Sequence, residues 1–467
     1  MKKTKIVCSI GPATNSEEVF ETLAKVGMNV ARCNFSHATL EERKTVENLV
    51  TKTNEKLGTN IALLYDTKGP EFRNGLVQEG GIILKEGATI RVVKEEVIGD
   101  ESRFSVNHPE ALDSLTVGNI IQLENGLMKI EVISKEEDGV TCKVINGGTL
   151  LNKKSLFVPG VILNIPFISD VDREDIIYAC QNAGDYLALS FVSCKEDVLK
   201  AREIIDSVDG NIKIISKVES KAGVENLDEI LEVSDGIMVA RGDLGEEVPM
   251  SLLAVYQKLM IRKTREHGKI CIVATEMLES MKHNSRPTRA EVTDVANAVL
   301  DGTDAIMLSG ETTVGEYPIE TVSYMASIAE DTENHFVNHF DYKGKIGRTE
   351  CIAKGAVDLT NYVDIKAITV SSISGFTAKF ISNFRPNCPI MATCTNDKVA
   401  RGLALYYGVY TTKVPVLHDM EKIIEIATAK TKEFFALNPE DKIVITGGTP
   451  INETGRITNF MKIEEIK

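Results

Sequence analysis

Two stretches of the sequence decide the fold, Lys213-Ile-Ile-Ser-Lys-Val-Glu219 and Gly236-Ile-Met-Val-Ala-Arg-Gly-Asp243. Each is an apolar run of strand length that ends in charged residues, and six similar runs occur elsewhere. Most are separated by amphipathic segments typical of helices, such as Ser16–Val26, Leu40–Leu57 and Ser251–His267. Eight strand–helix units predict a (β/α)8 TIM barrel, with an open doubly wound sheet as the alternative. The eight runs are Lys5–Ile10, Asn29–Phe35, Ile61–Thr67, Tyr186–Val192, Lys213–Glu219, Gly236–Asp243, Lys269–Glu276 and Ala305–Glu311.

The series is interrupted between Thr67 and Tyr186, where the helical pattern largely disappears. Short alternating runs with turn signals replace it, and Glu124-Asn-Gly126 is a hairpin signal. We interpret this segment as a small β-barrel domain inserted after the third strand. It would lie over the mouth where barrel active sites form and could act as a closing lid. The predicted strands are Gly81–Leu84, Ala88–Val93, Asn119–Leu123, Met128–Ile133 and Val140–Ile145.

A separate α/β unit follows the barrel. Its predicted strands are Ala367–Ser371, Pro389–Cys394, Val409–Val414, Lys442–Thr446 and Phe460–Glu464, and a helix is predicted over Met420–Leu437. The predicted domains are a discontinuous catalytic barrel (1–68 and 167–344), an inserted β-barrel lid (69–166) and a C-terminal α/β regulatory domain (345–467).

The composition is that of an ordinary globular chain with a strong acidic balance. Hydrophobic residues make up 43% of the chain, and the formal net charge is −15. This acidity argues against nucleic acid and anionic membranes as partners, and no N-terminal run is long enough for a signal-peptide core or a membrane span. The nine cysteines include no CxxC pair, which indicates reduced, mostly buried thiols in a cytoplasmic protein.

Nearly all of the predicted barrel strands end in polar or charged residues, which core packing does not require. Barrel geometry brings such ends together at one mouth. Glu219 and Asp243 are carboxylates on neighbouring strands and could share a hard divalent cation. Lys217 lies two residues before Glu219, so both point to the same face of a strand. A metal beside a lysine suits a substrate whose negative charge grows during the reaction.

Other residues at the mouth extend this chemistry. Arg32 and Arg73 are cations suited to phosphate, and 239–245 leads into a loop or helix start whose N–H groups could hold a carboxylate. A weaker oxygen cluster that could hold a monovalent cation consists of Asn34, Ser36, Asp66 and Thr67. Together these residues indicate a metal-assisted enzyme acting on a small phosphorylated or carboxylated anion. They leave lyase, aldolase and phosphotransferase chemistry open.

The same residues lie in motifs that resemble the pyruvate kinase family over essentially the full length. So many matching stretches in the family's order form a highly specific signal, and the chain is similar to bacterial members without the extra C-terminal domain. The matching stretches are Thr4–Ala13, Asn34–His37, Asp66–Glu71, Ser216–Ser220, Ala240–Gly245, Ala274–Met281, Arg286–Glu291, Asp294–Gly302 and Met307–Thr312.

The resemblance implies transfer of the phosphoryl group of phosphoenolpyruvate to ADP, giving pyruvate and ATP in the last step of glycolysis. It implies Mg²⁺ (or Mn²⁺) on Glu219 and Asp243, and K⁺ on Asn34, Ser36, Asp66 and Thr67. The implied catalytic residues are Lys217, Arg32 and Thr275. The implied substrate-binding residues are Arg32, Lys217, Gly242, Asp243 and Thr275, and the implied nucleotide-binding residues are Asn34, Phe35, Ser36, His37, Arg73 and Lys154.

Some positions differ from the residues usual in the family. Glu71 stands where members that do not depend on K⁺ tend to carry a lysine, so we expect K⁺ to be required. The other departures affect kinetic detail and lid contacts rather than the reaction. They are Phe72, Glu124, Asn125, Ser155, Ser193 and Glu276.

In the C-terminal unit, the loop Ser371–Thr377 places small hydroxyl residues and a glycine before a helix-like segment. This is typical of a phosphate cradle, although an ordinary connecting loop has the same composition. The resemblance implies a sugar-phosphate or AMP effector at Ser371, Ser372, Ser374, Gly375 and Thr377, and a homotetramer. Two other functions are kept as alternatives: a catalytically silent sugar-phosphate or nucleotide sensor, and a metal-dependent barrel lyase or aldolase.

Overall fold

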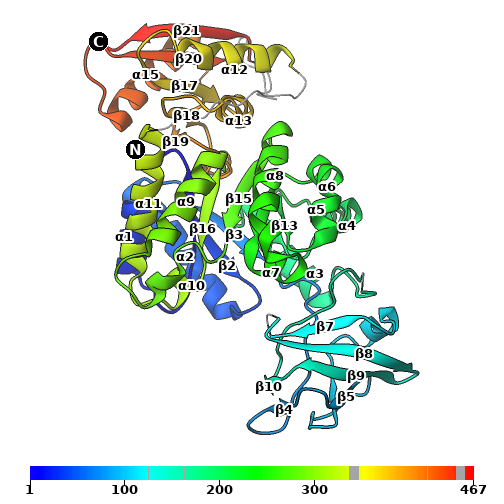
Figure 1. Cartoon of the computed structure of the whole chain (residues 1–467). Helices are drawn as coiled ribbons and strands as arrows, with labels where there is room; N and C mark the ends of the chain where they lie inside the picture. Colours follow the sequence, from blue (N-terminus) through cyan, green and yellow to red (C-terminus); the bar gives the residue numbers. More distant parts are fainter. Residues whose placement is uncertain (125, 162, 336–345, 418, 449–457) are drawn as a thin grey trace.

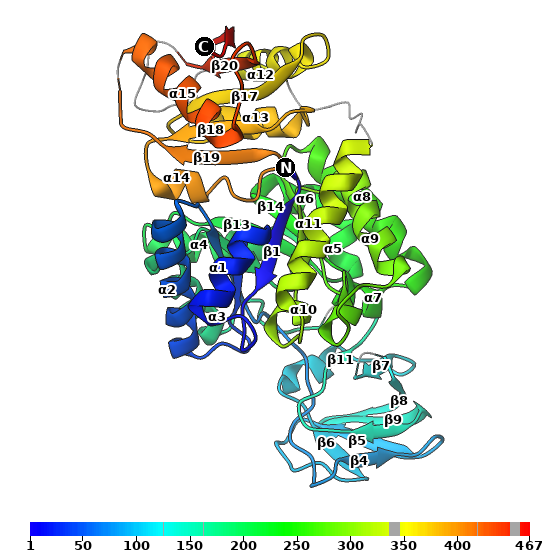
Figure 2. The same ribbon diagram turned by 90° about the vertical axis from the view of Figure 1, so that its left-hand side faces the viewer.

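The computed structural model describes residues 1–124, 126–161, 163–335, 346–417, 419–448 and 458–467. Figures 1 and 2 show three parts in a row: a central barrel, a small β unit at one end, and a sheet with helices at the other. The N-terminus lies where the barrel meets the C-terminal unit, and the C-terminus lies in that unit.

Eight parallel strands close into the central barrel in the order β1-β16-β15-β14-β13-β12-β3-β2. Closure is direct because β1 pairs with both β16 and β2. This confirms the predicted TIM barrel and excludes the open sheet. The strands are β1 (Lys5–Ser9), β2 (Val30–Asn34), β3 (Ala62–Asp66), β12 (Tyr186–Leu189), β13 (Lys213–Val218), β14 (Gly236–Ala240), β15 (Ile270–Ala274) and β16 (Ala305–Leu308).

The barrel strands end one to three residues before the predicted positions. The predicted strand Gly236–Asp243 is wrong at its end, because Arg241–Glu247 forms helix α7. Thr275 and Glu276 leave strand geometry because both have positive φ. The polar residues therefore lie in loops and short helices just beyond the strands, where barrel sites form.

Helices cover the outside of the barrel (Figure 1). Helix α2 (Leu40–Leu57) begins with a capping box between Thr39 and Glu42 and ends at Gly58, whose φ of 65° favours glycine. The other helices of this layer are α1 (Glu17–Val26), α3 (Asp170–Gln181), α4 (Lys195–Ser207), α5 (Lys221–Glu225), α6 (Leu227–Val233), α8 (Leu253–Glu266), α9 (Arg289–Asp301), α10 (Gly310–Thr313) and α11 (Pro318–His335).

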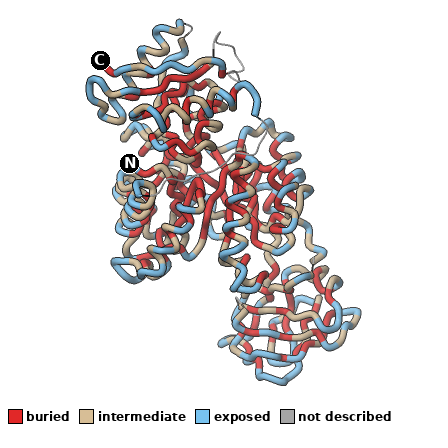
Figure 3. The backbone as a smooth tube through the Cα atoms, turned by 45° about the horizontal axis from the view of Figure 1, so that its top comes forward, coloured by how far each residue is buried: buried red, intermediate tan, exposed pale blue. Residues whose placement is uncertain are grey.

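The barrel interior and the C-terminal unit share one apolar cluster. It runs from Leu64 and Ile215 inside the barrel to Leu403 and Tyr406 beyond the amino ends of the barrel strands. We call this end of the barrel, which the C-terminal unit covers, the closed end. Figure 3 shows buried residues concentrated in the barrel and continuing into this unit. Removing this continuous surface from water holds the C-terminal unit against the barrel.

Residues between β3 and α3 form a β unit with its own core, which includes Phe104, Ile121 and Ile130. Six strands form a sheet in the order β11-β7-β8-β9-β5-β6, and β10 pairs with β4, which fits the predicted small barrel. The predicted hairpin turn falls between antiparallel β7 and β8, and Asn125 lies outside the described residues. The strands are β4 (Ile82–Leu84), β5 (Thr89–Val93), β6 (Arg103–Ser105), β7 (Ile120–Leu123), β8 (Met128–Glu136), β9 (Gly139–Asn146), β10 (Gly148–Leu150) and β11 (Leu156–Phe157).

The C-terminal unit is a five-stranded sheet in the order β19-β18-β17-β20-β21, in which only β21 runs antiparallel to its neighbour. It contacts the amino ends of the barrel strands: the Tyr186 hydroxyl donates to the Gly402 carbonyl at 2.9 Å, and Arg385 contacts Asp304 at 2.8 Å. The elements are β17 (Ile365–Ser372), β18 (Ile390–Cys394), β19 (Val409–Lys413), β20 (Lys442–Gly447), β21 (Phe460–Glu465), α12 (Arg348–Leu359), α13 (Phe376–Asn383), α14 (Asp397–Arg401) and α15 (Met420–Phe435).

Two simpler predictions concern the whole chain. In the described parts of the chain, no helix combines the length and the apolar character needed to cross a membrane. The cysteines are free thiols, and most are buried; Cys351 is exposed, and Cys180 and Cys194 are half-buried.

Candidate active site

The carboxyl ends of β3, β12 and β13 bring four polar residues into one buried cluster. The Lys217 ammonium lies 3.1 Å from Asp66 Oδ1 and 3.0 Å from Glu219 Oε1, and it donates to Ser190 Oγ at 2.6 Å. The Lys217 side chain is 12% exposed and the two carboxylates 1% each. A cation is therefore held between two carboxylates, largely out of water.

Arg32 at the end of β2 binds the other side of Asp66. Its Nε contacts Asp66 Oδ2 at 2.7 Å, and its Nη1 donates to Ser9 Oγ at 2.7 Å. Burying such a network of charges adds little to folding stability, because desolvation offsets the attraction. Perturbed charges gathered at a barrel mouth are instead typical of a functional site.

Burial and neighbouring charges shift the pKa values in this cluster differently. Burial lowers the pKa of Lys217, but the Asp66 and Glu219 carboxylates outweigh it, so the pKa rises above its ordinary value. Burial raises the pKa of Asp66, but Arg32 and Lys217 outweigh it and lower the pKa. For Glu219, burial raises the pKa more than Lys217 lowers it, and Asp243 adds to the rise. Of the two carboxylates beside Lys217, Glu219 is therefore the one whose negative charge is less fully compensated.

The loops after β14 and β15 are tied together at the same mouth. The Gly242 N–H donates to Thr275 Oγ1 at 2.8 Å, and Arg241 Nη2 donates to the Thr275 carbonyl at 2.6 Å. Thr275 has a φ of 71°, which a β-branched residue rarely adopts. Strained backbone of this kind is typical of functional sites, where surrounding contacts hold it in place.

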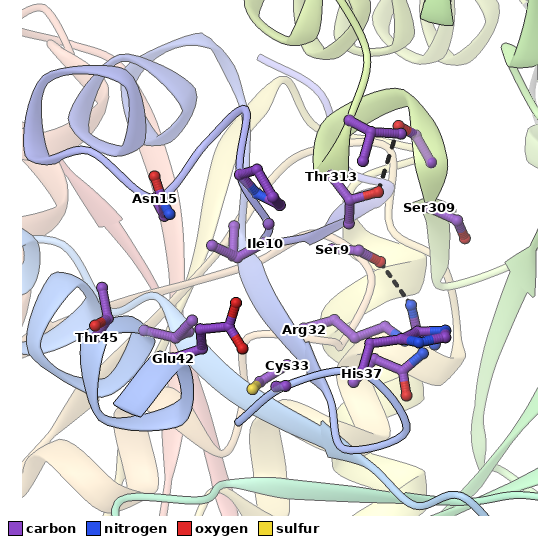
Figure 4. A pocket seen from close by; sticks show the side chains of 17 residues that line it. Ser9, Ile10, Asn15, Arg32, Cys33, His37, Glu42, Thr45, Ser309 and Thr313 are labelled. Atoms are coloured by element: carbon purple, nitrogen blue, oxygen red, sulfur yellow. Dashed lines mark hydrogen bonds between the residues drawn. The ribbon is translucent and has the colours of Figure 1, made fainter. Parts of the chain in front are cut away.

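A cavity of about 420 Å³ opens beside Arg32, between β1, β2, α2 and α10. Figure 4 shows Arg32 and His37 on one side of it, with Arg32 reaching Ser9. Asn34 also lines this cavity, which we call the side pocket. Its volume is within the range of small-molecule sites.

A smaller cavity of about 120 Å³ lies where the β unit joins the barrel. Glu71 and Arg73 line it from the segment that leaves the barrel, Ser155 lines it from the β unit, and Asp243 lines it from α7. The Arg73 guanidinium contacts the Glu71 carboxylate at 2.8 and 3.0 Å. Arg73 and Asp243 thus share a cavity between the lid and the mouth.

The predicted oxygen cluster lies around the buried charges. Asn34 Oδ1 accepts from the Ser36 N–H at 3.0 Å. The Thr67 carbonyl accepts from the Ser190 hydroxyl at 2.7 Å, and the same hydroxyl contacts Asp66 Oδ1 at 3.3 Å. Ser190 therefore links the oxygen cluster to Lys217.

Of the six predicted nucleotide-binding residues, Asn34 and His37 line the side pocket, Arg73 lines the smaller cavity, and Phe35 and Lys154 line neither. Phe35 is 6% exposed; its ring stacks on Tyr65 with centroids 4.7 Å apart, and the Arg43 guanidinium lies 3.9 Å from its centroid. Lys154 belongs to the β unit and pairs with Glu124 at 2.6 Å. The structure does not bring either side chain to the side pocket.

Comparison with known proteins agrees with this architecture. Residues 1–322 match the family described as pyruvate kinase, barrel domain, and residues 350–464 match the pyruvate kinase alpha/beta domain. The chain belongs to the pyruvate kinase family. Pyruvate kinases are phosphotransferases, and this selects one of the three chemistries that the mouth residues left open.

Individual pyruvate kinases match the whole chain. The enzyme of Geobacillus stearothermophilus is 42% identical over 100% of this chain and 80% of its own length. That of Clostridium perfringens is 39% identical over 100% of both chains. The crystal structure of a pyruvate kinase from Cryptosporidium parvum covers 100% of this chain and 96% of its own, with 36% identity and a TM-score of 0.94.

Members of the pyruvate kinase family depend in general on a divalent metal and potassium. Within the described ranges, no group of three or more His, Cys, Asp or Glu side chains is placed to hold a metal ion. Mg²⁺ often takes one or two carboxylates and completes its shell with water and substrate phosphates. The negative charge of Glu219 is only partly compensated by Lys217, and Asp243 lies nearby, which fits this mode of binding.

Sequence reasoning did not assign a role to Ser190 or Ser9. Ser190 contacts Lys217, Asp66 and Thr67, and Ser9 contacts Arg32. Ser190 lies within the predicted strand run Tyr186–Val192, one of those with polar residues near their ends. Its contacts come from strands far apart in the sequence, so no local motif could identify its partners.

The candidate effector loop joins β17 to α13. Gly375 has a φ of 80°, and its N–H donates to Ser372 Oγ at 2.8 Å. Thr377 Oγ1 lies 2.6 Å from Thr458 Oγ1. Ser371 is in β17 and Ser374 in the loop itself, so all five predicted residues lie along this short connection.

Proposed function

We propose that the chain transfers the phosphoryl group of phosphoenolpyruvate to ADP, giving pyruvate and ATP as the last step of glycolysis. The observation that carries this proposal is Lys217, buried between Asp66 and Glu219 at the barrel mouth. Phosphoryl transfer needs positioned cations around the moving group more than covalent participation. A lysine that two carboxylates keep protonated and fixed in position suits that task.

Lys217, Arg32 and Thr275 are the proposed catalytic residues. Lys217 would stabilise negative charge on the transferring group, and Arg32 would bind the phosphate of phosphoenolpyruvate. The Gly242 and Asp243 N–H groups, with the Thr275 hydroxyl, would hold the substrate carboxylate. Thr275 would also lie near the carbon that gains a proton when enolpyruvate becomes pyruvate.

Glu219 and Asp243 are the proposed ligands of Mg²⁺ or Mn²⁺. Burial and Asp243 raise the pKa of Glu219 although Lys217 lies 3.0 Å away, so a further cation would stabilise its carboxylate, which supports this assignment. A bound divalent ion would supply positive charge to the phosphoryl oxygens. Lys217 would then keep Glu219 oriented and would neutralise negative charge on the other side of the transferring phosphoryl group.

Asn34, Ser36, Asp66 and Thr67 are the proposed K⁺ ligands. Support comes from the pairing of Asn34 with Asp66 across β2 and β3, and from the Ser190 hydroxyl, which contacts both the fully buried Asp66 and the Thr67 carbonyl. Because Glu71 is an acid at the position where K⁺-independent members tend to carry a lysine, we propose that K⁺ is required.

The proposed nucleotide-binding residues are Asn34, Phe35, Ser36, His37, Arg73 and Lys154. The side pocket supports this assignment, because Asn34 and His37 line it next to Arg32. Phe35 would act by holding the Asn34–His37 segment, since its N–H donates to the Asp66 carbonyl at 2.9 Å. Lys154 and Arg73 would reach the nucleotide when the lid closes and excludes water.

Other parts of the proposal concern organisation and regulation. The three domains would have the boundaries 1–68 with 167–344, 69–166 and 345–467, and the protein would act in the cytoplasm as a homotetramer. The hydroxyl-rich loop would bind a sugar phosphate or AMP. Its support is the gathering of Ser372, Gly375 and Thr377 at the start of α13.

The test is pyruvate formation from phosphoenolpyruvate and ADP, measured with Mg²⁺ and K⁺ and with each cation omitted. We expect activity only when both cations are present. Glu219→Gln should lower kcat/KM by roughly a hundredfold or more, as expected when a metal ligand is lost. Glu225→Gln is the matched control, because this carboxylate is exposed and pairs with Lys221 on α5.

The outcomes separate the alternatives. Activity without a monovalent cation would contradict the K⁺ assignment alone. Carbon–carbon bond cleavage without a nucleotide would favour a lyase or aldolase. An inactive native chain, after fructose 1,6-bisphosphate, AMP and sugar monophosphates have been tried as activators, would favour the silent sensor.

A further inference from the structure

Among the described residues, the Lys217 ammonium has polar contacts with three side chains, and these contacts differ in charge. Two are with the carboxylates of Asp66 and Glu219, at 3.1 and 3.0 Å. The third is with the neutral hydroxyl of Ser190, and at 2.6 Å it is the shortest. Ser190 is 2% exposed, so this contact lies out of water.

The two carboxylates that contact Lys217 are also proposed metal ligands, Asp66 for K⁺ and Glu219 for Mg²⁺. A cation bound to either carboxylate would share its negative charge with Lys217 and would repel the ammonium. Repulsion between like charges is strong where little water screens it. The contact with the Ser190 hydroxyl does not depend on a charge that a metal ion would neutralise. It would therefore still hold the ammonium when both metal sites are filled.

The position of Ser190 at the end of β12 orients its hydroxyl toward Lys217. Strand β12 pairs with β3, and the Ser190 N–H donates to Thr67 Oγ1 at 3.2 Å. The Ser190 hydroxyl lies 2.7 Å from the Thr67 carbonyl and 3.3 Å from Asp66 Oδ1, so its single proton is best donated to the carbonyl. The lone pairs of the hydroxyl oxygen are then left to accept from Lys217.

The turn that contains Ser190 also supports Glu219. The next residue, Phe191, donates its N–H to Glu219 Oε2 at 2.6 Å, and its φ of 59° is rare for a bulky side chain. Gly69 packs closely on the other side, because a Cβ added there would lie 2.8 Å from Ser190 Cβ. Unfavourable backbone of this kind persists where surrounding contacts hold it. The turn after β12 thus fixes both Lys217 and Glu219.

We propose that Ser190 is a positioning residue, which keeps the Lys217 ammonium in place when Asp66 and Glu219 bind their metal ions. This inference rests on the proposed phosphotransferase function and its metal sites. Ser190 acts through Lys217, whose ammonium it contacts. Without the hydroxyl, Lys217 would rely on the carboxylates alone and would compete with K⁺ for Asp66.

Ser190→Ala is the informative substitution, because it removes the hydroxyl and leaves the charges of the site unchanged. Ser190→Cys is a second variant, which fills the space of the side chain but offers only a weak acceptor. The matched control is Ser216→Ala. Ser216 is fully buried on β13 directly before Lys217, and its hydroxyl lies 2.7 Å from that of Ser234. Neighbouring residues of a strand point to opposite faces, so this change leaves the Lys217 contacts in place.

The first measurement concerns K⁺ binding without substrates. The apparent melting temperature is recorded against KCl concentration, with tetramethylammonium chloride keeping the ionic strength constant. We expect K⁺ to stabilise the native chain, as a ligand of the folded state does. Ser190→Ala should need about tenfold more K⁺ for the same rise in melting temperature, a size typical of one hydrogen bond to a charged group. Ser190→Cys should shift in the same direction, and Ser216→Ala should keep the native K⁺ requirement.

The second measurement is pyruvate formation at saturating ADP, Mg²⁺ and K⁺, with phosphoenolpyruvate varied. Ser190→Ala should lower kcat about tenfold, because Lys217 would be less firmly placed beside the transferring group. The KM for phosphoenolpyruvate should change little, since Arg32 and the loops after β14 and β15 remain. A general loss of packing would lower the melting temperature of both alanine variants without changing the K⁺ requirement.

The proposal is overturned if Ser190→Ala and Ser216→Ala have the same K⁺ requirement, or if Ser190→Ala keeps the native kcat. A native chain that K⁺ does not stabilise would overturn it as well. Pyruvate formation by the native chain would leave the phosphotransferase function standing in all these cases. Absence of pyruvate formation by the native chain would overturn the function and the role of Ser190 together.

Discussion

Both ends of the barrel hold a partly buried lysine, and strand β13 carries both of them. Lys213 begins the strand at the closed end, where its ammonium donates to the Gly402 carbonyl and lies 5.1 Å from the Tyr406 ring centroid. Burial lowers the pKa of Lys213 to about 8. Lys217 ends the same strand at the mouth, where Asp66 and Glu219 raise its pKa despite burial.

The difference lies in the partners. At the closed end, a neutral carbonyl and aromatic rings hold the lysine, and they also join the barrel to the C-terminal unit. At the mouth, carboxylates hold the lysine, and Arg32, which pairs with one of them, lines the side pocket. Buried charge therefore serves domain docking at one end and chemistry at the other.

The largest expected effect comes from removing the lysine at the mouth. Lys217→Met should lower kcat by about a thousandfold, because a positioned cation beside the reacting group contributes on the order of 4 kcal/mol. Lys213→Met should keep kcat within a few-fold, since it lies at the other end of the strand. Steady-state pyruvate formation, normalised to folded protein by circular dichroism, checks both. Equal losses of kcat in the two variants would show that the lysine at the mouth has no special role in the reaction.

The next effect concerns the closed end alone. Asp304→Asn should lower the free energy of unfolding by about 3 kcal/mol, because Arg385 would be left as a buried charge without its partner. The apparent melting temperature should fall by several degrees, while kcat of the folded fraction is retained. A large loss of kcat at a temperature where the variant is fully folded would show that the two ends are not separable.

A smaller effect concerns pH and Lys213. In the unfolded chain the lysine keeps its ordinary pKa of 10.5, whereas in the folded chain the value is about 8. Between these values the unfolded state binds more protons, so stability rises with pH. Relative to Lys213→Met, the native chain should gain about 1–2 kcal/mol from pH 7.5 to 9.5. Parallel denaturation curves for the two proteins over this range would contradict the lowered pKa.

The smallest effect is expected on the surface. Asp364 pairs with Lys366 at 2.7 Å, but its side chain is 81% exposed. Asp364→Asn should leave the apparent melting temperature unchanged within error, because exposed ion pairs are screened by water and salt. A shift as large as that of Asp304→Asn would mean that burial is not what separates the two carboxylates.

Much of this architecture could be predicted because it depends on local patterns. The eight strand–helix units, the interrupting β unit and the five C-terminal strands follow from periodicity and turn signals. The polar strand ends and the family motifs also pointed to Arg32, Asp66, Lys217 and Glu219. The differences are at strand ends, such as that of β14, where a short helix takes over, and in the short strands β6, β10 and β11, which the patterns did not predict.

The sequence by itself determined which residues are apolar, which strand ends are charged and in what order the elements follow. Only the tertiary structure decided that Ser190 contacts Lys217, that Phe35 is buried against Tyr65, and that Glu42 faces the side pocket. It also decided that Lys213 and Lys217 have opposite pKa shifts. The physical reason is that charge, burial and cavity shape depend on neighbours from strands far apart in the chain, which local periodicity does not encode.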